Sequence, residues 1–146
     1  MSPIDLEVIR RKLTTISSNL ELLEPFRSIG LEAYRADVYR RKAVERILQE
    51  IVEAAADVNA HILVGSGRQA PESVHASFLA LAELGILDGA LVTSLAPSAG
   101  RRNRLVHQYD RIDDEKVLSA ARQALVEYRL YVSAIEKHLE RESRTP

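Results

Sequence analysis

The sequence predicts an all-α protein, an antiparallel helical bundle of about five helices that forms one domain over residues 1–146. Near both ends of the chain, apolar residues recur at alternating spacings of three and four, which is the period of a packed helix. Aromatic residues make up only 5% of the chain and Trp is absent, so the core is built mainly from aliphatic side chains. No Asn-Gly or Asp-Gly pair stands between alternating residues, as a β-hairpin requires.

The first helix is expected over residues 1–24. Its apolar seam consists of Leu6, Ile9, Leu13, Ile16, Leu20 and Leu23. Pro25 ends this helix, because proline cannot continue the hydrogen-bond ladder and disfavours helix at the preceding residue.

A long middle helix is expected from about Ala36 to Leu63. Its apolar stripe consists of Val44, Ile47, Leu48, Ile51, Ala55, Val58 and Ile62. Gly65-Ser66-Gly67 ends it and Pro71 prevents its resumption. Ser73 can cap a short helix that stops near Gly85, and Asp88 can cap another, which Pro97 and Gly100 kink or interrupt.

The last helix is expected to begin after Asp113, a favourable N-cap. Its apolar seam consists of Leu118, Ala121, Leu125, Tyr128, Val132, Ile135 and Leu139. We expect the hydroxyls of Tyr128 and Tyr131 to reach water, as is common for tyrosines in bundles. Residues 143–146 are expected to form a frayed tail.

Composition limits the class of protein. The chain contains no cysteine, which excludes disulfides and thiolate catalysis, and neither a signal peptide nor a membrane span is recognisable. A cytoplasmic protein that does not contact a membrane is therefore expected. The net charge of −1 attracts no nucleic acid globally.

The basic residues are clustered in three runs. Two of them, Arg10–Lys12 and Arg40–Arg46, are typical of solvated helix faces, and their contact with RNA is left open. The third run contains Arg101, Arg102, Arg104 and Arg111, and it lies beside a histidine and a tyrosine. For this third run we favour a function, with Arg101, Arg104 and Arg111 as possible RNA contacts.

The third run contains the groups needed to cleave a phosphodiester. Arg102 can hold a phosphate through two hydrogen bonds and stabilise its developing charge. His107 can accept the proton of an RNA 2′-hydroxyl or protonate the leaving oxygen near neutral pH. Asn103 adds a neutral donor and acceptor, and no metal ligand set is apparent, so metal-independent chemistry is predicted.

Arg102 and His107 cannot share one face of a straight helix, because five residues place them about 140° apart. Either the helix ends near Val106, or each side chain works with groups from elsewhere. A two-fold dimer is one solution, since it brings two copies of the motif into one cleft.

The run Arg101-Arg102-Asn103-Arg104-Leu105-Val106-His107-Gln108-Tyr109 closely resembles the Arg-x4-His-x-Tyr signature of HepT toxins, a branch of the HEPN superfamily. Arg102, His107 and Tyr109 match its three marked positions. The similarity extends from about Val44 to Leu139 through four further segments, 57–62, 71–73, 81–87 and 112–115. Gln108 and Arg101 depart from the residues that many relatives have, glycine and an aromatic residue respectively.

The resemblance implies a HEPN helical bundle that is active as a homodimer. It further implies a type VII toxin–antitoxin component, a metal-independent ribonuclease that cleaves tRNA or mRNA with Arg102 and His107. The implied partner is a MntA-type minimal nucleotidyltransferase antitoxin, which uses ATP to transfer AMP to the motif tyrosine, here Tyr109. No cofactor is implied for RNA cleavage itself.

Two alternatives stay open. In the first, the chain is a non-catalytic helical subunit of a nucleotidyltransferase complex, in which Arg102 and His107 hold a nucleotide or a partner. In the second, it is a dimeric scaffold with an incidental basic patch. Asp57 and His61 lie four residues apart on one helical face. They are candidates for positioning a catalytic group, although a local hydrogen bond between them is the more common arrangement.

Overall fold

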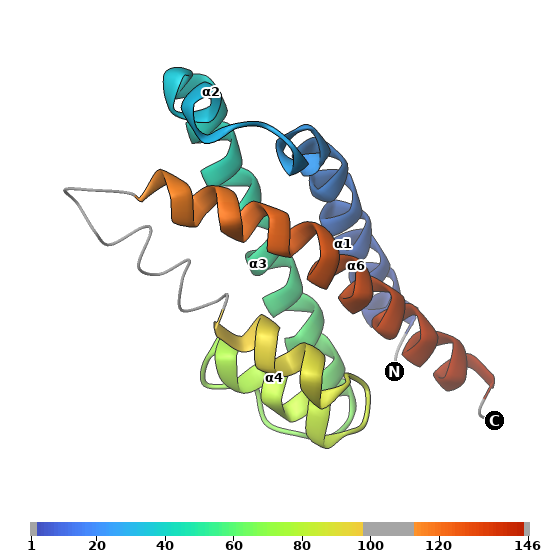
Figure 1. Ribbon diagram of the computed structural model, residues 1–146. Helices are drawn as coiled ribbons and strands as arrows, with labels where there is room; N and C mark the ends of the chain where they lie inside the picture. Colours follow the sequence, from blue (N-terminus) through green and yellow to red (C-terminus); the bar gives the residue numbers. More distant parts are fainter. Residues whose placement is uncertain (1–2, 98–112, 145–146) are drawn as a thin grey trace.

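The computed structural model describes residues 3–97 and 113–144, and all regular structure within these two stretches is helical (Figure 1). Its elements are α1 (Pro3–Leu23), the 3₁₀-helix η1 (Glu24–Arg27), α2 (Leu31–Ala36), α3 (Val38–Gly65), α4 (Val74–Glu83), a helix over residues 89–97, and α6 (Asp114–Arg144). The all-α prediction is therefore confirmed.

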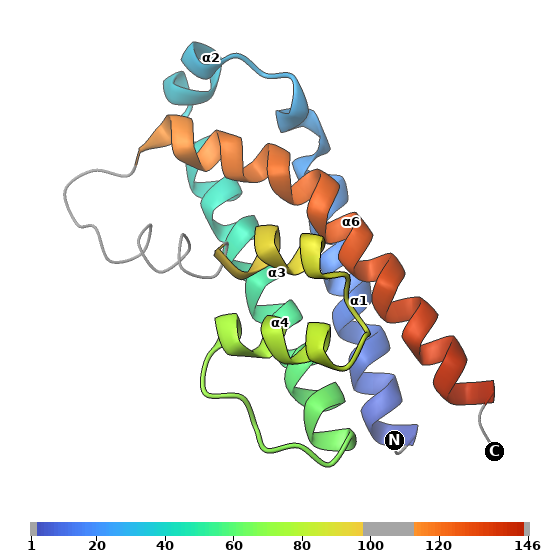
Figure 2. The ribbon, with the colours of Figure 1, turned by 60° about the horizontal axis from the view of Figure 1, so that its bottom comes forward.

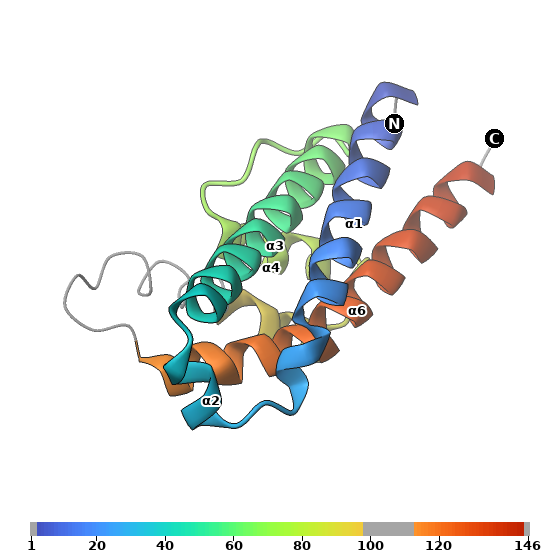
Figure 3. The same cartoon turned by 90° about the horizontal axis from the view of Figure 1, so that it is seen from above.

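The long helices pack across one another. α1 and α3 lie side by side with opposite directions, and α6 crosses this pair, as the views in Figure 1 and Figure 3 agree. α4 packs against the half of α3 that ends at Gly65, and residues 89–97 lie near α4 (Figure 2). At the opposite end of α3, the short α2 contacts both α3 and the beginning of α6.

Side-chain caps explain where three helices begin. The Asp37 carboxylate accepts hydrogen bonds from the backbone N–H groups of Tyr39 and Arg40 at the start of α3. Ser73 caps α4 in the predicted way, and Asp113 accepts from the N–H groups at the start of α6. Each cap satisfies donors that the first turn of a helix leaves without a partner.

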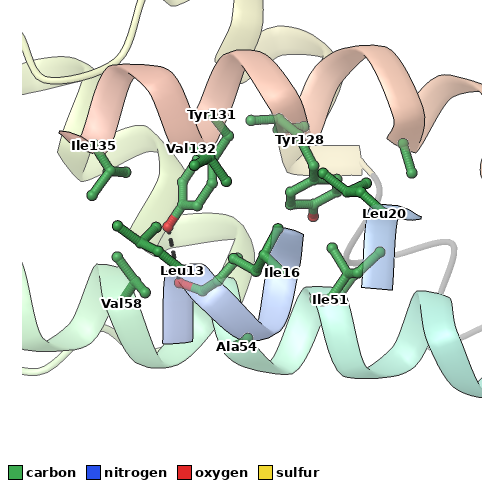
Figure 4. Close-up of a cluster of buried hydrophobic side chains, with 14 of the residues drawn as sticks. Leu13, Ile16, Leu20, Ile51, Ala54, Val58, Tyr128, Tyr131, Val132 and Ile135 are labelled. Carbon is green, nitrogen blue, oxygen red and sulfur yellow. Dashed lines mark hydrogen bonds between the residues drawn. The ribbon is translucent and has the colours of Figure 1, made fainter. Parts of the chain in front are cut away.

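The core follows the predicted apolar seams. Every residue of the predicted seam of α6 is buried, and so is every residue of the α1 seam except the half-buried Leu6. Figure 4 shows Leu13 and Ile16 of α1, Ile51 and Val58 of α3, and Ile135 of α6 in one cluster. The three long helices therefore share one core, which burial of apolar surface stabilises.

The structure corrects three expectations. Ser143 and Arg144 continue α6 instead of fraying, and the Ser143 hydroxyl donates to the Glu140 carbonyl oxygen at 2.8 Å. Tyr131 is fully buried and hydrogen bonded within the protein, so its hydroxyl does not reach water. The middle helix begins at Val38 rather than at about Ala36, because Asp37 caps it and Ala36 instead ends α2.

No helix in the two described stretches is both long enough and apolar enough to cross a lipid bilayer.

Candidate functional site

The residues predicted to carry the chemistry lie outside the described part of the chain. These are Arg101, Arg102, Asn103, Arg104, His107, Tyr109 and Arg111, all within 98–112. Their roles therefore stay predictions. What the structure does describe is the two places where the chain enters and leaves this segment, and the contacts that fix them.

The chain enters the segment from the helix over residues 89–97. The backbone N–H of Val92 donates to the Asp88 carbonyl oxygen at 3.0 Å, so this helix begins at the predicted position. Val92, Leu95 and Ala96 are buried in the core. The Nδ1 atom of His75 in α4 lies 3.4 Å from the Ala96 carbonyl oxygen, a weak contact that links α4 to this helix. Burial therefore anchors the chain just before the segment.

The chain leaves the segment at the capped beginning of α6. The Asp113 carboxylate accepts from the backbone N–H groups of Glu115 and Lys116 at 3.1 and 3.2 Å. The next residue, Asp114, lies with its carboxylate 3.9 Å from the Arg35 guanidinium of α2. The beginning of α6 is thus tied to α2 directly after the segment.

A buried phenol lies near this junction. Tyr34 of α2 is completely buried, and its hydroxyl has no hydrogen-bond partner among the described residues. Burial, followed by the negative charges of Glu45 and Asp114, raises the pKa of Tyr34. Burial also raises the pKa of Glu45, and the charge of Asp114 adds to that effect. The charges of Lys42 and Arg41 oppose the rise for Glu45, so groups of both signs surround the Tyr34 phenol near the start of α6.

A buried relay of hydrogen bonds joins α6, α3 and α4. The Tyr131 hydroxyl donates to Asn59 Oδ1 at 2.5 Å, and Asn59 Nδ2 donates to the Ser77 hydroxyl at 3.0 Å. The Ser77 hydroxyl in turn donates to the Val74 carbonyl oxygen at 2.6 Å. In Figure 4 the Tyr131 ring points from α6 towards α3. Because α4 also contacts Ala96, this relay connects the helices on both sides of residues 98–112.

Sequence reasoning missed this relay. Asn59 and Ser77 lie among apolar residues of helical period, and both are buried. A buried polar side chain needs a partner. A polar residue inside an apolar stripe therefore indicates a buried hydrogen bond, but nothing in the sequence identified Tyr131 as the donor.

Asp57 and His61 each pair with a residue of α1. The Lys12 ammonium lies 3.0 Å from the Asp57 carboxylate, and His61 Nδ1 lies 3.5 Å from the Asp5 carboxylate. All four side chains are more than a third exposed. The two pairs cross-link α1 to α3, and a positioning role for Asp57 and His61 in catalysis stays a prediction.

Within residues 3–97 and 113–144, no group of three or more His, Asp or Glu side chains is arranged to hold a metal ion.

The amino-acid sequence is similar to a known protein family and to individual proteins. Residues 16–135 match the protein family described as HepT-like, Ribonuclease HepT-like. The chain is 40% identical over 144 residues, 95% of each chain, to a protein of Aphanizomenon flos-aquae (strain 2012/KM1/D3) named tRNA nuclease HepT. It is also 33% identical over 90 residues, 62% of this chain and 67% of the relative, to a putative RNase of Archaeoglobus fulgidus.

Solved structures share the fold. A tri-AMPylated HEPN toxin of Shewanella oneidensis, in complex with an MNT antitoxin, superimposes with a TM-score of 0.81 at 23% identity, covering 94% of this chain and 99% of that chain. A cytosolic protein of unknown function from Bacillus subtilis superimposes with a TM-score of 0.79 at 18% identity, covering 92% and 90% of the two chains. At these identities the likeness concerns the helical fold.

Proposed function

Because the chain belongs to the ribonuclease HepT-like family, we propose that it is a ribonuclease, the toxin component of a HepT/MntA toxin–antitoxin pair. The observation that carries this proposal is the 40% identity to a tRNA nuclease HepT across 95% of both chains. The Arg102, His107 and Tyr109 positions of the signature are intact in the sequence. The substrate is RNA, with tRNA as the first choice because that relative is named for it.

Arg102 and His107 form the catalytic pair of this proposal. Arg102 holds the scissile phosphate by two hydrogen bonds and stabilises the charge that develops on it. His107 takes the proton from the attacking 2′-hydroxyl or gives one to the leaving oxygen. Asn103 supports the phosphate site, and Arg101, Arg104 and Arg111 contact the RNA backbone. None of these steps needs a metal ion.

The antitoxin acts on Tyr109. A solved structure of the same fold holds an AMPylated HEPN toxin with an MNT antitoxin, and another toxin–antitoxin structure contains AMP-PNP. We propose that a MntA-type antitoxin transfers AMP from ATP to the Tyr109 hydroxyl of this chain, with release of pyrophosphate. Each AMP adds a phosphate next to Arg102, so it competes with RNA for the guanidinium and fills the cleft.

The proposed active form is a cytoplasmic homodimer of a single-domain chain. Two-fold symmetry places two copies of the segment that contains Arg102 and His107 at one cleft. In the monomer, the helix 89–97 and the capped start of α6 flank this segment.

Growth inhibition tests the proposal in cells. Expression of the wild-type chain without antitoxin should arrest growth, and Arg102→Ala and His107→Ala should each restore it while the helix content is unchanged. Arrest that persists in either variant contradicts the assigned catalytic roles. Arg10→Ala, an exposed arginine of α1, is the matched control and should remain toxic.

A further inference from the structure

An exposed tyrosine lies among cationic side chains where α2 meets α3. Tyr39 is 83% exposed, more than any other large hydrophobic residue of the described stretches. Tyr39, Lys42 and Arg46 recur at helical spacing, so they share one face of α3, and all three are exposed. Together with the exposed Arg35 and Arg40 they define the basic–aromatic face.

The acidic residues of the same stretch are fewer than its basic residues. Between residues 35 and 46 the chain has five basic and two acidic side chains. Asp37 is engaged as the cap of α3, where its Oδ1 atom accepts from two backbone N–H groups. Glu45 is half-buried beside the Tyr34 phenol. This stretch therefore carries a net positive charge, although Arg35, Arg40 and Arg46 each lie within 3.9 Å of a carboxylate.

The ion pairs on this face are exposed and exchangeable. Arg46 lies 3.1 Å from Glu50, and Arg40 lies 3.5 Å from Asp37, with half or more of each arginine side chain exposed. Exposed pairs of this kind contribute little to stability, so a phosphate can replace the carboxylate at small cost. An exposed phenol adds a flat surface on which an unpaired base can stack.

The position of the face links it to the candidate site. The Arg35 guanidinium lies 3.9 Å from the carboxylate of Asp114, the first residue of α6. In Figure 1 and Figure 3, α2 and the beginning of α3 lie beside the beginning of α6. The basic run of α1 lies elsewhere, because its Lys12 pairs with Asp57 in the half of α3 that ends at Gly65.

We propose that the basic–aromatic face is an RNA-binding surface, which holds a single-stranded part of the substrate next to the catalytic segment. Lys42, Arg46 and their neighbours bind backbone phosphates, and Tyr39 stacks on an unpaired base. The inference rests on the proposed ribonuclease function, since it extends the footprint of the same substrate. It assigns a role to the Arg40–Arg46 run and none to Arg10–Lys12.

Binding measured without cleavage tests the surface. The full chain with His107→Ala is titrated in EDTA against a short fluorescent single-stranded RNA, and anisotropy gives the Kd. Tyr39→Ala should weaken binding about ten-fold, within the range of one stacked base, whereas Tyr39→Phe should bind like the parent. Lys42→Gln with Arg46→Gln should lower the slope of log K against log salt by about 1.4, which is about 0.7 for each phosphate that is no longer neutralised.

Arg10→Gln with Arg11→Gln is the matched control, since it removes the same charge from exposed positions of α1 and should leave the Kd unchanged. The inference would be overturned if the Tyr39→Ala protein and the Lys42→Gln/Arg46→Gln protein bound RNA as tightly as the parent. The inference would also be overturned if these variants kept their RNA affinity but lost antitoxin binding or self-association. The face would then be a protein interface. Failure of the wild type to cleave RNA would overturn the ribonuclease proposal instead, and the binding data would stand separately.

Discussion

The Tyr131 hydroxyl of α6 donates a 2.5 Å hydrogen bond to the Asn59 carboxamide of α3, although 72 residues separate the two in sequence. Both residues are fully buried, so neither group can turn to water instead. Through Asn59 and Ser77 the bond continues to α4. The relay thus adds polar contacts between the helices on either side of residues 98–112 to the apolar core that they share.

Tyr131→Phe should lower the free energy of unfolding by about 1–3 kcal/mol, because the buried Asn59 oxygen loses its donor. The aromatic contacts with Phe78 and Tyr128, at centroid distances of 5.9 and 5.8 Å, are available to phenylalanine as well. The loss therefore reports the hydroxyl alone. Urea denaturation measures it, and a variant as stable as wild type would show that the relay contributes nothing.

Tyr34→Phe should change the free energy of unfolding in the opposite direction. Its hydroxyl is buried without a hydrogen-bond partner among the described residues, and a buried polar group without a partner costs free energy. Removing it should leave stability unchanged or raise it by about 1 kcal/mol. The edge contact between the rings of Phe26 and Tyr34, at 6.2 Å, remains possible in the variant. A clear destabilisation in the same urea assay would mean that the hydroxyl has a partner.

The long helices were predictable from sequence, while the connections and the relay were not. The seams of α1 and α6 repeat over many residues, so burial of one face decides their structure. η1 and α2 are too short for a period, and contacts with α6 across the chain stabilise them instead. The predicted seam of α6 contains Tyr128 but not Tyr131, and only the tertiary neighbour Asn59 makes the Tyr131 hydroxyl a buried donor.

The candidate site depends on the sequence alone. Side-chain chemistry singled out Arg102 and His107, and the resemblance to the Arg-x4-His-x-Tyr signature gave Tyr109 its role; all three stay predictions, because they lie outside the described residues. The structure adds how the flanking helices are held and where an exposed tyrosine meets basic residues. The sequence shows Tyr39 beside the Arg40–Arg46 run, but the exposure of Tyr39 and the position of this run near α6 depend on which helices pack together.

Stability should fall in acid through Glu24. Hydrogen bonds from Arg27 and then Arg129 lower the pKa of Glu24 from its ordinary value of 4.5 to about 2. A lowered folded-state pKa stabilises the protein above the ordinary value, and this stabilisation is lost as the pH falls towards 2. Glu24→Gln should therefore be less stable than wild type at pH 7, and the difference should shrink between pH 4.5 and 2.

The pairs of Glu24 are exposed, so their contribution is modest and should weaken in high salt. Arg129→Gln removes the partner on α6 and should show the same direction of pH dependence. Thermal unfolding followed by circular dichroism across the pH series measures both. A stability difference that is constant with pH would exclude the carboxylate as its source.

AMPylation should require Tyr109. Incubation with a MntA-type antitoxin and ATP should increase the mass of the chain in steps of one AMP, and Tyr109→Phe should abolish the increase because it lacks the acceptor hydroxyl. Tyr39→Phe is the matched control, since it removes an exposed phenol hydroxyl elsewhere and should be modified normally. A mass increase that survives in Tyr109→Phe would place the acceptor on another side chain.

RNA cleavage in EDTA tests the ribonuclease proposal most directly. Purified wild-type protein, free of antitoxin, is incubated with total tRNA and with an mRNA, beside the His107→Ala protein. We expect the wild type to cleave RNA in EDTA and the folded His107→Ala protein to leave it intact. Absence of cleavage by the folded, unmodified wild type, or equal cleavage by both proteins, would contradict the proposal.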